Sequence, residues 1–319
     1  MAAKKKPKEM AGEEAETSLS QSPATDPRST QRTISDLTRL LNAQHFSSKE
    51  EVDELMRNLS ASGPLPMIPP SSAVEEAQDI MYEAWLAKSR AKRIKLAKKA
   101  LSISPDCADA YVLLAEETST SAEEALRLYA EGMAAGERAI GPKSFKEMEG
   151  HFWGLLETRP YMRARNGYAS TLWHMGQKDK AIAHYQDMLR LNPNDNQGVR
   201  YYLLELYQDI GDDDALEVLI KRYHKDYSAN WFYTEALLLF RRQGAGKRAN
   251  KRLKEALAQN PHVPKYLLGQ KKLPKQHPAY IGFGDENEAI DYASTAIPFW
   301  LQTPGAIEWL RAAAEEAVD

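Results

Sequence analysis

The sequence has a single cysteine, Cys107, among its 319 residues. One thiol excludes an intramolecular disulfide framework and a cysteine-rich zinc site, and it is typical of a protein in the reducing cytosol. No window of about 18 residues is free of charge, so we expect no membrane insertion. The formal net charge of −3 gives no overall attraction for nucleic acid or anionic lipid. These features together predict a soluble, cytoplasmic protein.

The N-terminal part of the chain differs in composition from the rest. Residues 1–31 are rich in Lys, Glu, Ser, Thr and Pro, and their basic start is not followed by the apolar segment of a secretory signal. This composition predicts a disordered tail. Residues 32–72 carry apolar side chains at spacings of three and four, then the Pro-rich stretch GPLPMIPPSS. We therefore predict two short amphipathic helices and a linker, followed by the main helical region, 73–319.

The main helical region contains an internal repeat. Ala181, Ala215 and Ala249 recur at intervals of 34 residues, and Pro193 and Pro261 lie 68 residues apart, which is two such periods. A period of 34 with helix–turn–helix punctuation is the signature of the tetratricopeptide repeat (TPR). Small alanines are expected where helices cross closely, and prolines where a helix must stop. The sequence thus predicts an all-α fold, a TPR-like α–α superhelix or solenoid.

The repeat pattern sets the expected boundaries. About five helix–turn–helix repeats are interrupted by an insertion at about 142–161, which follows the second of them. A Pro- and Lys-rich connector, 263–284, then leads to a closing helical hairpin, 286–319, that caps the solenoid. The five repeats are expected at 74–107, 108–141, 162–195, 196–229 and 230–263.

Three stretches are more specific than the repeat itself. ISPDCADAYVLLAEE (103–117), NPHVPKYLL (260–268) and GDENEAIDYA (284–293) resemble the suppressor of tumorigenicity 7 family, in that order. The resemblance covers roughly residues 74–310. In that family the repeat region accompanies membrane-spanning segments, for which this sequence has no counterpart. The resemblance implies a helical fold and a binding role, and it supplies no catalytic residue.

The segment from Gly136 to Ser144, GERAIGPKS, is close to the sequence motif of a phosphate-binding P-loop. Pro142 separates the second glycine from Lys143, however, and no strand precedes the loop. We therefore interpret the segment as a helix end that is capped by Gly141 and broken by Pro142.

Catalytic and metal-binding patterns are missing. The seven histidines, His151 among them, do not have the spacing of metal ligands, and no Ser or Cys nucleophile motif is present. We expect no enzymatic activity, no cofactor and no metal. The catalytic alternative is a small-molecule site in the insertion, around His151 and Glu157.

Two stretches have both a functional and a structural interpretation. Residues 88–99 contain seven basic residues and no acidic one, which suits a nucleic-acid-associated helical repeat or a solvated helix face. The aromatic stretch 150–165 either contributes to a binding face or fills a gap between repeats with Phe152, Trp153 and Leu156. A smaller basic cluster consists of Arg248, Lys251 and Arg252.

The first helix of each repeat is expected to line a concave groove. Arg163, Arg200 and Arg241 would form one basic strip there and hold an acidic or C-terminal carboxylate-bearing peptide, unless they brace neighbouring helices instead. The function predicted is a non-enzymatic scaffold or adaptor that binds a protein or peptide segment, with nucleic-acid binding through helix 88–99 as the alternative. The partner-binding residues proposed are Arg163, Asn166, Ser170, Trp173, Arg200, Tyr207 and Arg241.

Overall fold

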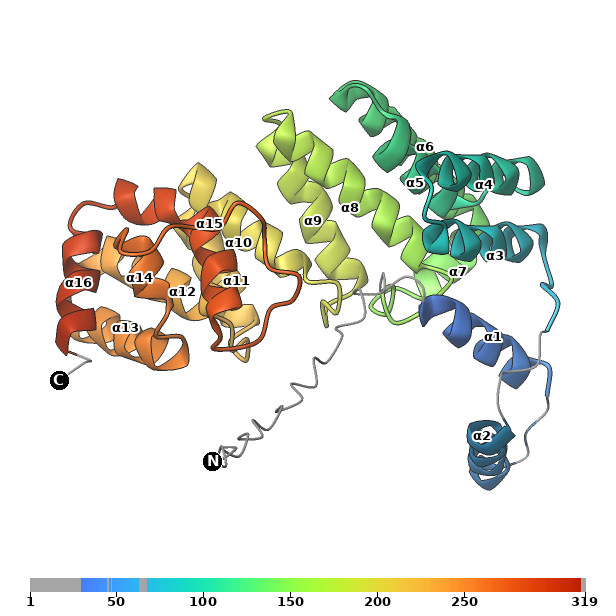
Figure 1. Ribbon diagram of the computed structural model, residues 1–319, viewed down its shortest axis with the longest axis horizontal. Helices are drawn as coiled ribbons and strands as arrows, with labels where there is room; N and C mark the ends of the chain where they lie inside the picture. Colours follow the sequence, from blue (N-terminus) through green and yellow to red (C-terminus); the bar gives the residue numbers. More distant parts are fainter. Residues whose placement is uncertain (1–29, 45, 47, 63–67, 317–319) are drawn as a thin grey trace, which may run out of the picture.

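The computed structural model describes residues 30–44, 46, 48–62 and 68–316, and every regular element in these ranges is an α-helix (Figure 1). The predicted all-α class is confirmed. The predicted disordered tail, 1–31, lies outside the described residues except for Thr30 and Gln31, which begin the first helix. Five residues of the expected linker, 63–67, lie outside them as well.

Ten of the helices form five pairs, in which two consecutive helices pack against each other across a short turn. Each pair nearly coincides with one of the windows that the 34-residue period delimits, and the pairs follow one another along an arc (Figure 1). The pairs are α3 (Ala73–Leu86) with α4 (Arg90–Ile103), α5 (Ala108–Thr118) with α6 (Ala122–Ile140), α8 (Arg159–His174) with α9 (Lys178–Leu191), α10 (Val199–Ile210) with α11 (Asp213–Arg222), and α12 (Ala229–Gln243) with α13 (Lys247–Gln259).

Local sequence explains where these helices begin and where they come close. Ser72 and Ser228 each accept a hydrogen bond from the backbone N–H three residues later, which satisfies a free donor at the helix start. Ala249, one of the recurring alanines, is fully buried. A Cβ added at Gly167 would collide with the ring of Tyr129, so glycine permits the close approach of α8 to α6.

The glycine–proline junction after α6 ends one helix and begins another. Gly141 follows the last residue of α6 with a φ of 76°, a conformation that favours glycine, and its N–H donates to the carbonyl of Glu137. Pro142 is the first residue of α7 (Pro142–Glu147), where its missing N–H is harmless. The interpretation as a helix end is confirmed.

The insertion fills the space between the second and third pairs. The backbone N–H groups of Gly150 and Phe152 both donate to the carbonyl of Leu191 at the end of α9, at 2.9 and 3.2 Å. Phe152 is fully buried, and its ring packs edge-on against Phe145 and Tyr161, with centroid distances of 4.6 and 5.9 Å. The aromatic stretch therefore packs as a plug, one of its two predicted roles.

The basic run 88–99 lies mostly on α4. Arg93 donates to a carboxylate oxygen of Glu117 at 2.5 Å, and Arg90 pairs with the other oxygen of the same carboxylate at 3.4 Å. Ala97 and Ala100 face the core, and Lys98 is exposed. Two arginines of the run are thus paired within the chain, and its five lysines are exposed, as on a solvated helix face.

The C-terminal part departs from the prediction at one point. The expected connector begins with a short helix, α14 (Val263–Leu267), four of whose five residues are buried. Helix α15 (Glu286–Gln302) packs along α14 and α12 and reaches α10, and α16 (Ala306–Glu316) packs against α13 (Figure 1). The interpretation of 263–284 as a connector does not include this helix, because prolines and lysines hide the apolar spacing of Val263, Tyr266 and Leu267.

The two N-terminal helices behave differently from each other. Helix α1 (Thr30–Asn42) docks on α3, where Arg39 donates to both carboxylate oxygens of Asp79 at 2.8 and 2.9 Å and Leu40 is buried. Helix α2 (Lys49–Ser62) contributes to none of the three clusters of buried apolar residues that form the core. None of its side chains between positions 49 and 59 is buried.

Candidate functional site

The predicted groove residue Arg163 is held inside the chain. It lies on α8, and its Nε donates to Oδ1 of Asp109 at 2.7 Å, while an Nη donates to the side-chain oxygen of Gln31 at 3.1 Å. Asp109 is completely buried, and the guanidinium lies 5.2 Å from the centre of the Trp85 ring. Arg163 therefore connects α1, α3, α5 and α8.

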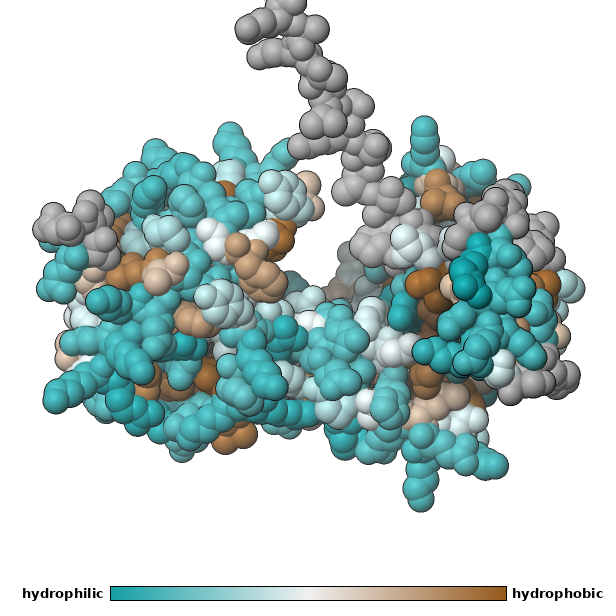
Figure 2. Space-filling view, turned by 90° about the horizontal axis from the view of Figure 1, so that it is seen from below, coloured by the Kyte–Doolittle hydropathy of each residue, from teal (hydrophilic) through white to brown (hydrophobic). Residues whose placement is uncertain are grey.

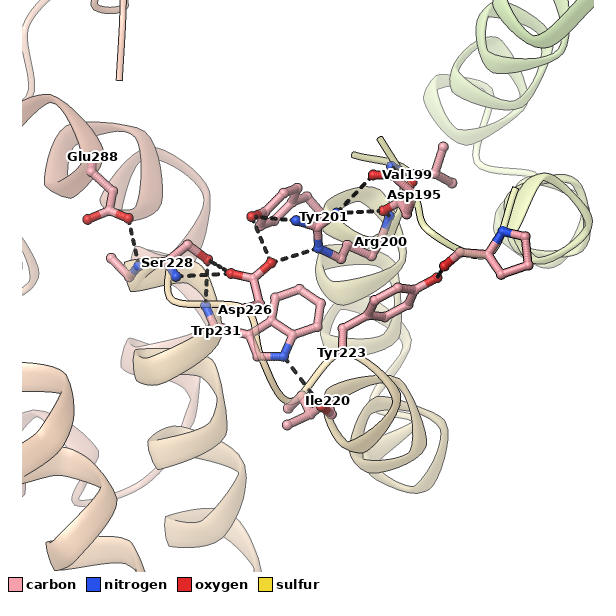
Figure 3. A network of polar contacts seen from close by, with 12 residues as sticks. Asp195, Val199, Arg200, Tyr201, Ile220, Tyr223, Asp226, Ser228, Trp231 and Glu288 are labelled. Carbon is pink, nitrogen blue, oxygen red and sulfur yellow. Dashed lines mark hydrogen bonds and ion pairs between the residues drawn. The ribbon is translucent and has the colours of Figure 1, made fainter. Parts of the chain in front are cut away.

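Arg200 is the centre of a denser polar network (Figure 3). Its Nε donates to Asp226 at 2.7 Å, and an Nη donates to Asp195 at 2.9 Å. The hydroxyl of Tyr201 donates to the same oxygen of Asp226 at 2.8 Å. The rings of Tyr201 and Trp231 lie 4.4 and 5.8 Å from the guanidinium, so Arg200 ties the start of α10 to the turn that precedes α12.

The carboxylates around Arg200 are almost inaccessible to water. The side chains of Asp195 and Asp226 are 1% and 3% exposed. Burial acts to raise the pKa of Asp226, but the hydrogen bonds from Ser228, Arg200 and Tyr201 outweigh it and keep this pKa below its usual value. The network is thus a buried ion pair whose acceptors are satisfied.

Arg241 and Tyr207 are also committed to contacts within the chain. Arg241 on α12 donates to Asp213 at the start of α11, at 3.2 Å from its Nε. Tyr207 is 5% exposed, and its hydroxyl accepts a hydrogen bond from Gln186 at 2.9 Å. The predicted arginines therefore do not form a shared strip of unpaired charge, and each braces neighbouring helices, which was the alternative role considered from the sequence.

The remaining predicted residues lie together on α8. Asn166, Ser170 and Trp173 are half-buried, and the carbonyl of Ser170 is 2.7 Å from Nδ1 of the exposed His174. The side-chain oxygen of Asn166 has no hydrogen-bond partner among the described residues. These four residues follow one another at spacings of four, three and one, so Asn166, Ser170 and His174 share one face of the helix.

Helix α10 presents two residues that the sequence did not single out. Tyr202 is 38% exposed and stacks on the buried Tyr185 of α9, with ring centroids 5.2 Å apart. Glu205 follows one turn later on the same face. Burial raises the pKa of Glu205 to about 7, the carboxylates of Asp209 and Asp291 add to the rise, and His174 opposes it. Glu205 on α10 is therefore within electrostatic range of Asp291 on α15 and of His174 on α8.

The molecular surface has a hollow between its two ends. Figure 2 shows the hollow between the part of the molecule formed by α10–α16 and the part formed by α1–α8, with hydrophobic and hydrophilic side chains at its edge. We call the face formed by Asn166, Ser170, His174, Tyr202 and Glu205 the α8–α10 face. Only the α8 side of it was accessible to sequence reasoning, because Glu205 acquires its environment from Asp291, which is remote in the chain.

The pKa of Glu205 predicts a pH dependence. The pKa of Glu205 is higher in the folded chain than that of an exposed glutamate, so the folded state binds the proton more tightly. The resulting contribution to the free energy of unfolding is complete below about pH 4.5 and is lost as pH rises through about 7. We expect Glu205→Gln to raise the free energy of unfolding at pH 8 by about 1–2 kcal/mol, after allowance for partial solvent screening, and to have no such effect at pH 4.5. Urea unfolding at the two pH values measures this, with the exposed Glu123→Gln as the control. Equal effects at both pH values would contradict the assignment.

Comparison with known proteins identifies the family. The family model described as ST7 protein matches residues 58–319 of the chain. The chain belongs to the ST7 family. It is similar to the cattle suppressor of tumorigenicity 7 protein-like, with 30% identity over 257 residues that cover 73% of this chain and 46% of the cattle protein.

Other relatives show the same extent. The human suppressor of tumorigenicity 7 protein-like is 30% identical over 257 residues, covering 73% of this chain and 44% of the human protein. The Drosophila melanogaster protein ST7 homolog is 29% identical over 293 residues, covering 83% and 53%. The chain thus spans about half the length of the curated relatives that it matches.

No helix in the described part of the chain has the length and apolar character required to cross a bilayer. In the same part of the chain, no three His, Cys, Asp or Glu side chains are placed to hold a metal ion.

Cys107 is buried at the start of α5, where burial raises the pKa of its thiol to about 12.

Proposed function

We propose that this ST7-family chain is a non-enzymatic scaffold of TPR-like helix pairs that binds a segment of a partner protein against the α8–α10 face. The observation that carries the proposal is the set of uncommitted groups on this face: an amide oxygen at Asn166, an exposed ring at Tyr202 and the carboxylate of Glu205. Flat aromatic area beside unpaired polar groups is what a bound peptide uses for affinity and orientation.

The stacked helix pairs support this role. The five pairs follow the 34-residue period of the sequence, as consecutive repeats of a superhelix would. In such an array the first helices of successive repeats share a concave surface that suits an extended or helical segment. Here α15 packs on α12, so the face that remains for a partner is the one shared by α8 and α10.

The charge of the face favours a basic partner segment over the acidic one expected from the arginines. Arg163, Arg200 and Arg241 are already bonded to Asp109, to Asp195 and Asp226, and to Asp213. A partner carboxylate would have to replace those bonds, which are buried or half-buried. Glu205 has no hydrogen bond or ion pair among the described residues, and a cation nearby would return its pKa toward the ordinary range.

A peptide-binding experiment tests this proposal. Selection of displayed random 12-residue peptides for binding to the folded chain should enrich sequences that combine Lys or Arg with apolar residues. Fluorescence anisotropy should then give the affinities of the enriched peptides. Tyr202→Ala with Glu205→Lys should weaken binding by at least about tenfold, because a stacking surface is lost and the charge is reversed. The matched control is Tyr227→Ala with Glu123→Lys, which changes an exposed ring and an exposed carboxylate elsewhere.

The outcomes separate the candidates. Enriched peptides that bind both variants equally would place the binding surface elsewhere and contradict the proposal. Enrichment of acidic peptides would instead support the acidic partner that the sequence predicts from the arginines. Salt-labile binding of arbitrary RNA that Lys98→Glu with Lys99→Glu abolishes would instead favour nucleic-acid binding through α4.

A further inference from the structure

Helix α2 presents an apolar stripe that is not fully buried in the described part of the chain. Val52, Leu55, Met56 and Leu59 fall on one face at spacings of three, one and three, and Met56 is 39% exposed. None of the described side chains of α2 is buried, and α2 joins no core cluster. An amphipathic helix of this kind gains little stability until its stripe is covered.

The charge of α2 is one-sided. Its helical segment contains two cations, Lys49 and Arg57, against four anions, Glu50, Glu51, Asp53 and Glu54, which leaves a net charge of −2. On a helix, Glu51 and Asp53 lie on either side of the apolar stripe. A surface that covers this stripe should therefore be apolar at its centre and basic at its edges.

Such a surface exists at the opposite end of the molecule. A groove of about 840 Å³ lies between α13, α14 and α16, with Leu257, Pro264, Leu268 and Ala314 among the residues that line it. Lys254 and Arg311 also line it, from α13 and α16, and both are exposed. Helix α13 as a whole carries five cations and one anion, and it contains the smaller basic cluster noted in the sequence.

The groove and α2 cannot meet within one copy of the chain. Figure 1 places α2 next to α1, at the end of the molecule remote from α13, α14 and α16. The segments that tether it, 43–48 and 63–72, have six and ten residues, which span at most about 20 and 35 Å. Because Arg39 fixes α1 to α3, α2 stays at its own end.

We propose that α2 of one copy docks into the groove between α13, α14 and α16 of a second copy, so that the chain associates head to tail. The stripe of α2 covers Leu257, Pro264 and Leu268, and the acidic residues that border the stripe face Lys254 and Arg311. Glu315 and Glu316, at the end of α16, face the two cations of α2. This is recognition of an amphipathic helix in a groove, and it is separate from the α8–α10 face.

A head-to-tail contact has a distinctive consequence. The two surfaces that meet are different, so each copy keeps one free helix and one free groove after it has bound a neighbour. Association therefore continues to rings or open chains instead of stopping at a dimer. Because charges contribute at the edges, it should weaken as salt concentration rises.

Sedimentation velocity of the full chain over a range of concentrations tests this inference. We expect the mean mass to rise with concentration, through dimers to larger species. Leu55→Gln with Leu59→Gln removes the stripe, and Lys254→Glu with Arg311→Glu reverses the charge of the groove. Each pair should leave the chain monomeric, weakening association by more than about tenfold. Lys98→Glu with Lys99→Glu, exposed on α4, makes the same change of net charge as the groove variant and should leave association unchanged.

Two combinations make the test specific. A mixture of the stripe variant and the groove variant contains one working helix and one working groove, so it should form a one-to-one dimer and nothing larger. Glu51→Lys with Asp53→Lys, placed in the same chain as the groove variant, should restore association by exchanging the charges. A wild-type chain that stays monomeric at every concentration would overturn the inference, as would a mixture that does not dimerise.

Discussion

Replacing Arg200 with methionine is expected to lower the free energy of unfolding by about 3–5 kcal/mol, because it leaves two buried carboxylates without their cation. Asp195 and Asp226 are 1% and 3% exposed, so water cannot replace the guanidinium. The rings of Tyr201, Tyr223 and Trp231 also lose the charge that lies within 6 Å of each. Such a loss is a large share of the stability of an ordinary domain.

Urea unfolding followed by circular dichroism measures this effect. The matched control is Arg127→Met, because Arg127 is 60% exposed and pairs with Glu131 one turn away; its loss should change stability by less than about 0.5 kcal/mol. Adding Asp226→Asn to Arg200→Met should recover part of the loss, since one of the two uncompensated charges disappears. An Arg200→Met chain as stable as the wild type would contradict the bracing role. It would favour the partner-binding role that the sequence predicts for Arg200.

Phe152→Ala is expected to lower the free energy of unfolding by about 3–5 kcal/mol, because it empties a fully buried site that the neighbouring residues cannot collapse to fill. Phe145 and Tyr161 contact the ring from two sides, and the backbone N–H of Phe152 is fixed to the carbonyl of Leu191. The change should loosen the insertion before the rest of the chain unfolds.

Thermal unfolding and limited proteolysis together check the second prediction. The melting temperature should fall, and trypsin should cut after Lys143 or Lys146 sooner than in the wild type. Phe283→Ala provides the control, since that ring is 73% exposed and its removal should be nearly neutral. If Phe152→Ala left both readouts unchanged, the aromatic stretch would not act as a plug.

Residues far apart in the sequence decided which charges are available for binding. The repeat period places the arginines at positions 163, 200 and 241 in equivalent positions, but it does not reveal that each has a carboxylate within hydrogen-bond distance. Asp109 precedes Arg163 by 54 residues, and Asp226 follows Arg200 by 26. Helix periodicity identifies the face of a residue but not the side chain that another helix brings opposite to it.

The environment of Glu205 also could not be predicted from the sequence. In the sequence it is one of 45 acidic residues and has no distinctive neighbours. It becomes distinctive only because α15 brings Asp291 beside α10, which depends on how the closing hairpin packs. The groove between α13, α14 and α16 likewise required α14, whose apolar residues lie among prolines and lysines.

By itself, the sequence determined the all-α class, the approximate windows of the helix pairs, the helix end at Gly141 and Pro142, and the resemblance to the ST7 family. These follow from local causes: apolar spacing selects the buried face of a helix, and glycine and proline restrict the backbone wherever they occur. The tertiary structure alone decided that the arginines brace the helix pairs, that Glu205 is half-buried near other carboxylates, and that none of the side chains of α2 from 49 to 59 is buried. Burial and Coulomb energies depend on distances between helices, and those distances are properties of the assembled fold.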